Sequence, residues 1–171
     1  ALDVTTSAGT QAVTGVGFEP KLVLFSAGTD STTEGFSGSN TRFGFGAMTA
    51  AAQWCMTSFG QDNANPSDEQ GVGRTDAALV RIGNALTTTM LASRSALHSD
   101  GFTINKSTAP GATLRCGYAA LGGAGLLAEL TAFNQPTSPG TQPISGLGFP
   151  PVAELFVSAG RVASTTPTGS A

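Results

Sequence analysis

The feature that most constrains the fold of this chain is a pair of similar stretches, one near each end. Residues 9–25 read Gly-Thr-Gln-Ala-Val-Thr-Gly-Val-Gly-Phe-Glu-Pro-Lys-Leu-Val-Leu-Phe, and residues 140–156 read Gly-Thr-Gln-Pro-Ile-Ser-Gly-Leu-Gly-Phe-Pro-Pro-Val-Ala-Glu-Leu-Phe. The two stretches align without a gap at a spacing of 131 residues, and Ser-Ala-Gly follows both, one residue later after the second. Matches in this order indicate one complete module followed by the opening of another.

Between the two stretches, short apolar runs alternate with turn-forming residues. Lys21–Phe25 is apolar after its lysine, Phe102–Lys106 alternates apolar with polar side chains, and Gly83-Asn84 separates two β-branched runs. Sustained helical periodicity is absent. About ten short strands with frequent turns predict an all-β fold, an antiparallel β-sandwich or jelly roll, with a partial second copy at the C-terminus.

Several segments carry more specific expectations. Residues 30–40 and 61–73 are rich in polar and turn-forming residues, so both are predicted to be loops. Residues 126–133 are predicted to form a strand. Residues 53–59 are also predicted as a strand, with a short helix over 48–53 as the alternative because alanine favours helices.

The expected organisation has three parts. Residues 1–123 form a β-sandwich module, 124–161 an incomplete second module or exchanged strands, and 162–171 a flexible tail of mainly Ser, Thr, Pro and Gly. The second copy lacks the strands that follow the first. We therefore expect it to pack on its own domain, on residues outside this sequence, or on a neighbouring subunit by strand addition.

Charge and hydropathy exclude two classes of partner. Charged residues make up 11% of the chain, and the net charge of −3 comes from scattered groups without a basic run. A nucleic-acid surface needs clustered Lys or Arg. The longest apolar runs are too short to cross a bilayer, and the start Ala1-Leu-Asp-Val shows no signal peptide. Neither nucleic acid nor a membrane is expected as a partner.

The titratable residues form no recognisable catalytic arrangement. His98 is the only histidine, and Asp100 fits a turn better than a base-orienting role. Gly15-Val-Gly17 leads into a strand instead of the helix N-terminus that a phosphate loop requires. Cys55 and Cys116 are expected to be buried free thiols, with a disulfide as the alternative. The sequence therefore predicts a protein without catalysis and without a cofactor.

One predicted loop carries oxygen ligands of the kind that Ca²⁺ prefers. Its spacing matches no EF-hand, and Asn65-Pro66 equally suits a turn. The candidates for metal binding are Asp62, Asn63, Asn65, Asp68 and Glu69.

Apolar side chains of the second copy and of one loop are the candidates for contact with a partner. Phe36 lies in a Gly/Ser-rich loop, whereas Trp54 and Tyr118 lie within apolar strands and are expected in the core. The full set of interface or ligand candidates is Phe36, Leu126, Leu130, Phe133, Phe149 and Phe156.

Three ordered motifs resemble a module of tailed-bacteriophage virion proteins. They are Val-Thr-Gly-Val-Gly-Phe-Glu-Pro-Lys over residues 13–21, Asp-Gly-Phe-Thr over 100–103, and Ala-Leu-Gly-Gly over 120–123. The second copy departs from the pattern at Pro150 and Val152, and no Asp-Gly-Phe-Thr follows it.

The resemblance implies a structural role in a bacteriophage virion. The implied form is a capsid decoration or cement protein that assembles as a homo-oligomer and with other virion proteins. One alternative is a tail or tail-fibre module. Another is a lectin-like, carbohydrate-binding adhesin that faces the host surface or the extracellular medium and binds a glycan.

Overall fold

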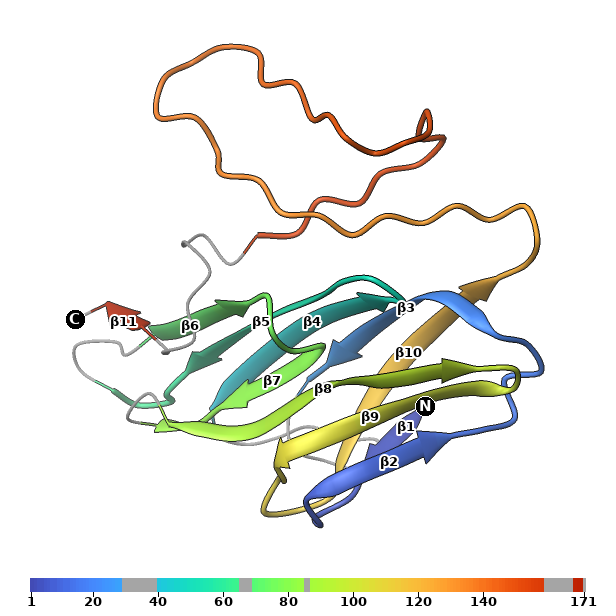
Figure 1. Ribbon diagram of the computed structural model, residues 1–171. Coiled ribbons are helices and arrows are strands. Elements are labelled where there is room, and N and C mark those ends of the chain that lie inside the picture. Colours follow the sequence, from blue (N-terminus) through green and yellow to red (C-terminus); the bar gives the residue numbers. More distant parts are fainter. Residues whose placement is uncertain (29–39, 65–68, 85–86, 159–167, 171) are drawn as a thin grey trace.

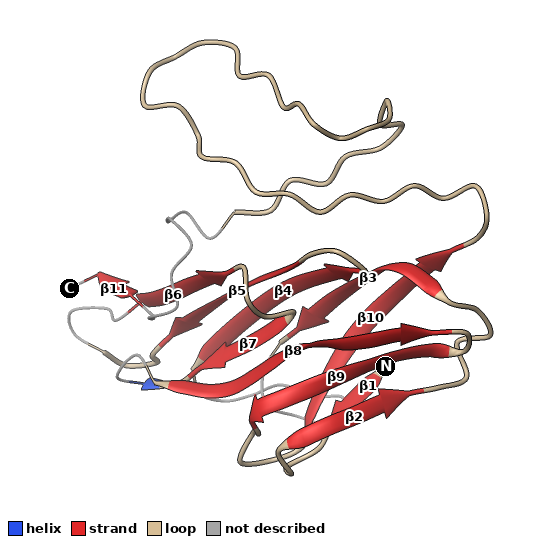
Figure 2. Cartoon of the chain, in the orientation of Figure 1, coloured by secondary structure: helices blue, strands red, loops and turns tan. Residues whose placement is uncertain are grey.

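The structure is a computed structural model that describes residues 1–28, 40–64, 69–84, 87–158 and 168–170. Two antiparallel sheets face each other and form a sandwich (Figure 1). Strands account for almost all of the regular structure in the described residues (Figure 2). The predicted all-β sandwich is confirmed.

Seven strands form the larger sheet and four form the smaller one. The larger sheet runs, in spatial order, β1 (Leu2–Val4), β10 (Leu114–Gly122), β3 (Pro20–Ala27), β4 (Thr41–Thr49), β5 (Gln53–Gly60), β6 (Glu69–Arg74) and β11 (Thr168–Ser170). The smaller sheet runs β2 (Gly9–Val13), β9 (Gly101–Thr108), β8 (Thr88–His98) and β7 (Leu79–Ile82).

The connectivity differs from that of a jelly roll. Strands β3 to β6 follow one another across the larger sheet, and β7 to β9 do the same in the smaller sheet. Both sheets are therefore built mainly from consecutive hairpins and not from two Greek keys. The chain closes the module when β10 returns to lie between β1 and β3.

The core lies between the sheets and is centred on Phe102 of β9. Its ring packs edge-to-face on Phe25, with centroids 5.6 Å apart, and on Tyr118, with centroids 5.3 Å apart. Such edge-to-face pairs stabilise a core beyond the burial of their area. A second buried cluster lies toward the other end of the sandwich and consists of Cys55, Phe59, Val72, Ala77, Val80 and Ile82.

Gly46 of β4 lets the chain that leads into the smaller sheet approach closely. Phe43 is exposed and Phe45 is half-buried, whereas the alternate residues Gly44 and Gly46 are buried. A side chain on Gly46 would collide with the backbone carbonyl of Ala78. The alternation of phenylalanine and glycine therefore gives β4 the bare inner face that close packing requires.

The two cysteines are buried free thiols, as expected. Burial raises the pKa of Cys55 to about 12, and it raises the pKa of Cys116 to about 12 as well. Because the reactive form of cysteine is the thiolate, both side chains act here as small apolar core residues.

Two predictions about single segments are wrong. Residues 126–133 form no strand, because no described strand lies beside them to complete a ladder. Residues 69–73, the end of the predicted loop 61–73, belong to β6 because β5 offers them an edge and Gln70 and Val72 become buried. Thr168–Ser170, which lie in the segment expected to be a tail, pair with β6 as β11. The alternative helix over 48–53 is also wrong, since β4 continues to Thr49.

Candidate functional site

A carboxylate joins the two sheets at the point where the chain crosses from one to the other. Asp100 lies in the turn between β8 and β9, and Gly15-Val-Gly17 connects β2 to β3. The Asp100 carboxylate accepts the backbone N–H of Gly15 at 2.9 Å and that of Gly17 at 2.8 Å. The Val16 N–H donates to the Asp100 backbone carbonyl at 3.2 Å. We call this arrangement the Asp100 clamp.

The glycines give the clamp its shape. Gly15 has φ +81° and Gly17 has φ +82°, a region that residues with a side chain rarely adopt. Consecutive N–H groups in such a turn converge on one anion. These N–H groups lower the pKa of Asp100, and His98 contributes a smaller effect in the same direction. The clamp therefore holds an ionised carboxylate.

A second polar contact holds the start of the chain to the smaller sheet. The Gln11 side-chain amide donates to the backbone carbonyl of Asp3 at 2.7 Å. Its oxygen accepts a hydrogen bond from the buried Lys106 of β9 at 2.7 Å, and Lys106 also donates to the hydroxyl of Thr5 at 2.8 Å. Burial lowers the pKa of Lys106. Neutral oxygens thus hold this buried ammonium group in place.

The backbone of the second sequence copy reproduces features of the first. We call residues 2–25 the first opening, and residues 133–156, which lie 131 positions later, the second opening. Gly146 has φ +86° and Gly148 has φ +70°, at the positions that match Gly15 and Gly17. The Gln142 side chain donates to the backbone carbonyl of Asn134 at 2.9 Å, as Gln11 does to Asp3.

The two openings differ in what surrounds them. In the first, Leu2 is 4% exposed and Phe25 is 1% exposed, because β10 and β4 pair with the strands that carry them. At the matching positions of the second, Phe133 is 43% exposed and Phe156 is 64% exposed. Among the residues that the structure describes, no acceptor meets the N–H groups of Gly146 and Gly148. The second opening has the local turns of the first without its partners.

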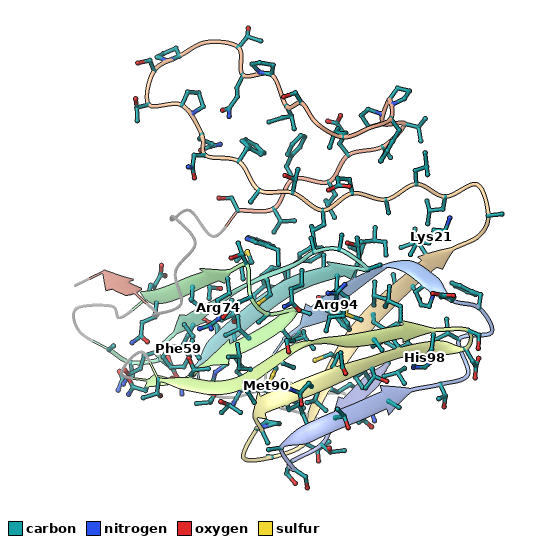
Figure 3. The ribbon with its side chains drawn as sticks, in the orientation of Figure 1. Lys21, Phe59, Arg74, Met90, Arg94 and His98 are labelled. Carbon is teal, nitrogen blue, oxygen red and sulfur yellow. The ribbon has the colours of Figure 1, made fainter. Side chains whose placement is uncertain are left out.

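The second opening belongs to a long strandless segment, residues 123–158, which we call the arm. The arm leaves the end of β10 and runs above the sheets (Figure 1). Lys21 fixes its start by donating to the carbonyl of Leu126 at 2.9 Å, and Figure 3 shows this lysine beside the arm. Farther along, Phe133 and Phe156 pack edge-to-face with ring centroids 5.8 Å apart.

The predicted interface residues mostly lie on the arm. Leu126, Leu130 and Phe149 are half-buried, whereas Phe133 and Phe156 are exposed and contact each other. Leu130 lines an open pocket beside Trp54 and Arg94. Phe36 lies outside the described residues.

The predicted metal ligands are not brought together by the described part of the chain. Asn65 and Asp68 lie outside the described residues. Asn63 occupies a turn with φ +59°, the backbone of Asp62 donates to the side chain of Asn40, and Glu69 begins β6. Within the described ranges, no three His, Cys, Asp or Glu side chains gather in a way that could hold a metal ion.

His98 and the core aromatics are placed by packing. The imidazole of His98 lies 3.3 Å from the hydroxyl of Thr103, and the nearby Asp100 carboxylate is directed to the glycine N–H groups. Tyr118 packs on the core, as expected, whereas Trp54 is half-buried at the rim of the open pocket.

Local sequence indicates both halves of the Asp100 clamp but not their contact. Gly15-Val-Gly17 is a glycine pair that leads into a strand, and Asp100 suits a turn. A Gly-x-Gly turn with its N–H groups exposed calls for an anionic acceptor. An aspartate at a hairpin tip of the facing sheet is the kind of residue that can provide this acceptor.

No protein-family model matches this sequence, and comparisons with curated proteins and with solved structures likewise found no match. In the described part of the chain, no helix has the length and apolar character needed to cross a membrane.

Proposed function

We propose that this chain is a structural component of a bacteriophage virion, in the form of a capsid decoration or cement protein. It acts through subunit interfaces and without catalysis. The observation that carries the proposal is that the side chains of Phe133 and Phe156 on the arm are exposed to solvent. The sandwich beside the arm has a core of its own.

Exposed aromatic side chains favour an assembled state. Covering a phenylalanine contributes about 1.5–3 kcal/mol, so two of them on one segment supply a substantial driving force for association. The arm forms no ladder of its own in the described residues, which leaves its backbone groups available for pairing with another chain. Both properties suit a part that works by being joined to neighbours.

The polar groups of the sandwich support a structural role. The Asp100 carboxylate binds backbone N–H groups, and Lys106 binds the turn between β1 and β2. Arg74 pairs with Asp76 through two hydrogen bonds of 2.8 Å and 2.7 Å. Each of these groups holds strands or turns together, which is the use expected in a rigid component of an assembly.

The experiment is to purify particles of the phage that encodes this chain and to measure its copy number by quantitative mass spectrometry. We expect many copies per particle, located on the head by immunogold labelling. Location on the tail would overturn the decoration role and keep the virion role. Absence from purified particles would overturn both.

A paired substitution tests whether the arm provides the interface. The double variant Phe133→Ser/Phe156→Ser should be lost from particles, because it removes the exposed apolar pair. Phe43→Ser is the matched control, since Phe43 is an exposed phenylalanine on the sandwich itself. Equal incorporation of both variants would exclude the arm as the interface.

A further inference from the structure

We propose that the second opening is a docking element for one kind of partner polypeptide. That partner supplies strands equivalent to β4, β9 and β10. It also carries an aspartate in a hairpin turn equivalent to the turn between β8 and β9. This inference rests on the proposed assembly function and names the chemistry of the partner. Three features of the second opening define what the partner must offer.

The first feature is the glycine turn at 146–148. Its two glycines adopt the conformation of those in the Asp100 clamp, and in the described part of the chain their N–H groups lack an acceptor. In the first opening, the carboxylate of Asp100 fills this position. The partner therefore carries an aspartate, or another carboxylate, at a hairpin tip that faces Gly146 and Gly148.

The second feature is the amide of Gln142. Its nitrogen already donates to the carbonyl of Asn134, as Gln11 does to that of Asp3. In the first opening the amide oxygen binds Lys106, which lies on β9 and pairs across the sheet with Gly9. A lysine on the strand after the partner's hairpin would complete the same contact with Gln142.

The third feature is the apolar strand at the end of the second opening. An ungapped match would place Glu154 at the position of Val23, which is fully buried. The one-residue offset of Ser158 can instead be placed before Glu154, as a β-bulge between Gly148 and Glu154, and this register moves Glu154 to the outer face. Leu155 and Val157 then take the inward positions, where a partner strand like β4 or β10 would cover them. In this register Phe156 takes the position of Leu24, which is half-buried in the first opening.

The sites in this chain that fit the second opening are already filled. The first opening pairs with β10 through β1 and β3, with β9 through β2, and with β4 through β3. A second copy of the chain could accept the second opening only by releasing its own first opening. That first opening is part of the same chain and is therefore held at high effective concentration. The partner is therefore a polypeptide with this arrangement of strands and an empty place beside them.

The experiment extends the chain after Ala171 with a second copy of residues 40–122, which supplies the proposed partner strands. Amide hydrogen exchange of residues 133–157 is then compared with that in the chain without the extension. We expect exchange at Gly148 and Leu155 to slow by about 100-fold or more, because these amides become part of a folded sandwich. Unchanged exchange across the second opening would overturn the proposal.

Variants in the extended chain separate docking from general collapse. Gly148→Val should abolish the new protection, whereas Gly125→Val, at an open arm glycine without a positive φ, should leave it intact. Leu155→Lys should abolish it and Glu154→Lys should not, because only Leu155 faces inward after the bulge. Protection that survives Gly148→Val and Leu155→Lys would overturn the proposed contacts.

This experiment is independent of the virion role. Protection of the second opening together with absence of the chain from particles would remove the virion proposal and leave the docking chemistry. A chain that is abundant in particles but whose second opening stays unprotected would remove the docking chemistry alone.

Discussion

The carboxylate of Asp100 accepts the backbone N–H of Gly17 at 2.8 Å, although the two residues are 83 positions apart in the sequence. The contact joins a hairpin tip of the smaller sheet to the crossover that leads into the larger sheet. One carboxylate therefore fixes the relative position of the two layers at this end of the sandwich.

Asp100→Asn should lower the melting temperature of the chain. Asparagine keeps the size of the side chain but replaces one acceptor oxygen with a donor, so it can satisfy only one of the two glycine N–H groups. Asp62→Asn is the matched control, because the Asp62 side chain takes no part in the clamp. Thermal unfolding monitored by circular dichroism checks this, and an equal effect of the two substitutions would contradict it.

The stabilising effect of Asp100 should depend on pH. The glycine N–H groups hold the pKa of Asp100 below its ordinary value of 3.8 in the folded chain. The contribution is therefore present above about pH 4 and is lost as the pH falls through the folded-state pKa. Urea unfolding of the natural chain and of Asp100→Asn should show a stability difference that shrinks below pH 4. A difference that grows on acidification would contradict this.

Alanine at the two matching glycines should have unequal effects. Gly17→Ala forces a side chain into a positive φ although space is available, which costs about 1 kcal/mol of unfolding free energy. Gly148→Ala carries the same local strain but lies on the arm, outside the cooperative sandwich. Chemical denaturation should therefore detect the first substitution and not the second, and equal losses would show that the arm unfolds with the sandwich.

The matching phenylalanines should also differ. Phe25→Ala removes a ring from the core contact with Phe102 and should lower the unfolding free energy by about 3–5 kcal/mol. Phe156→Ala removes an exposed ring and should change it by less than about 0.5 kcal/mol. Urea denaturation of the isolated chain measures both, and a large loss from Phe156→Ala would mean that the arm is part of the core.

Much of the fold follows from local signals in the sequence. Gly83-Asn84 marks the β7–β8 hairpin and Ser99-Asp-Gly101 marks the β8–β9 hairpin, because both offer residues that suit tight turns between alternating runs. Other strands lack such signals. Strand β6 contains two glycines and few apolar residues, and it forms because β5 offers an edge and Arg74 reaches Asp76.

The arm shows the opposite case. Residues 126–133 have the composition of a strand but no partner strand among the described residues, and a strand is stable only within a sheet. Local sequence reports what a segment can form, whereas pairing depends on residues far away in the chain. Local sequence does not predict the Asp100 clamp for the same reason, since its parts lie 83 and 85 positions apart.

Hydrogen exchange of the natural chain, free and in its assembled state, tests whether the arm is the part through which this protein is joined to others. The account predicts fast exchange of residues 133–157 in the free chain and strong protection of the same residues after assembly, with the first opening protected in both states. Fast exchange of the arm in the assembled state, with new protection confined to the outer faces of the sandwich, would contradict it.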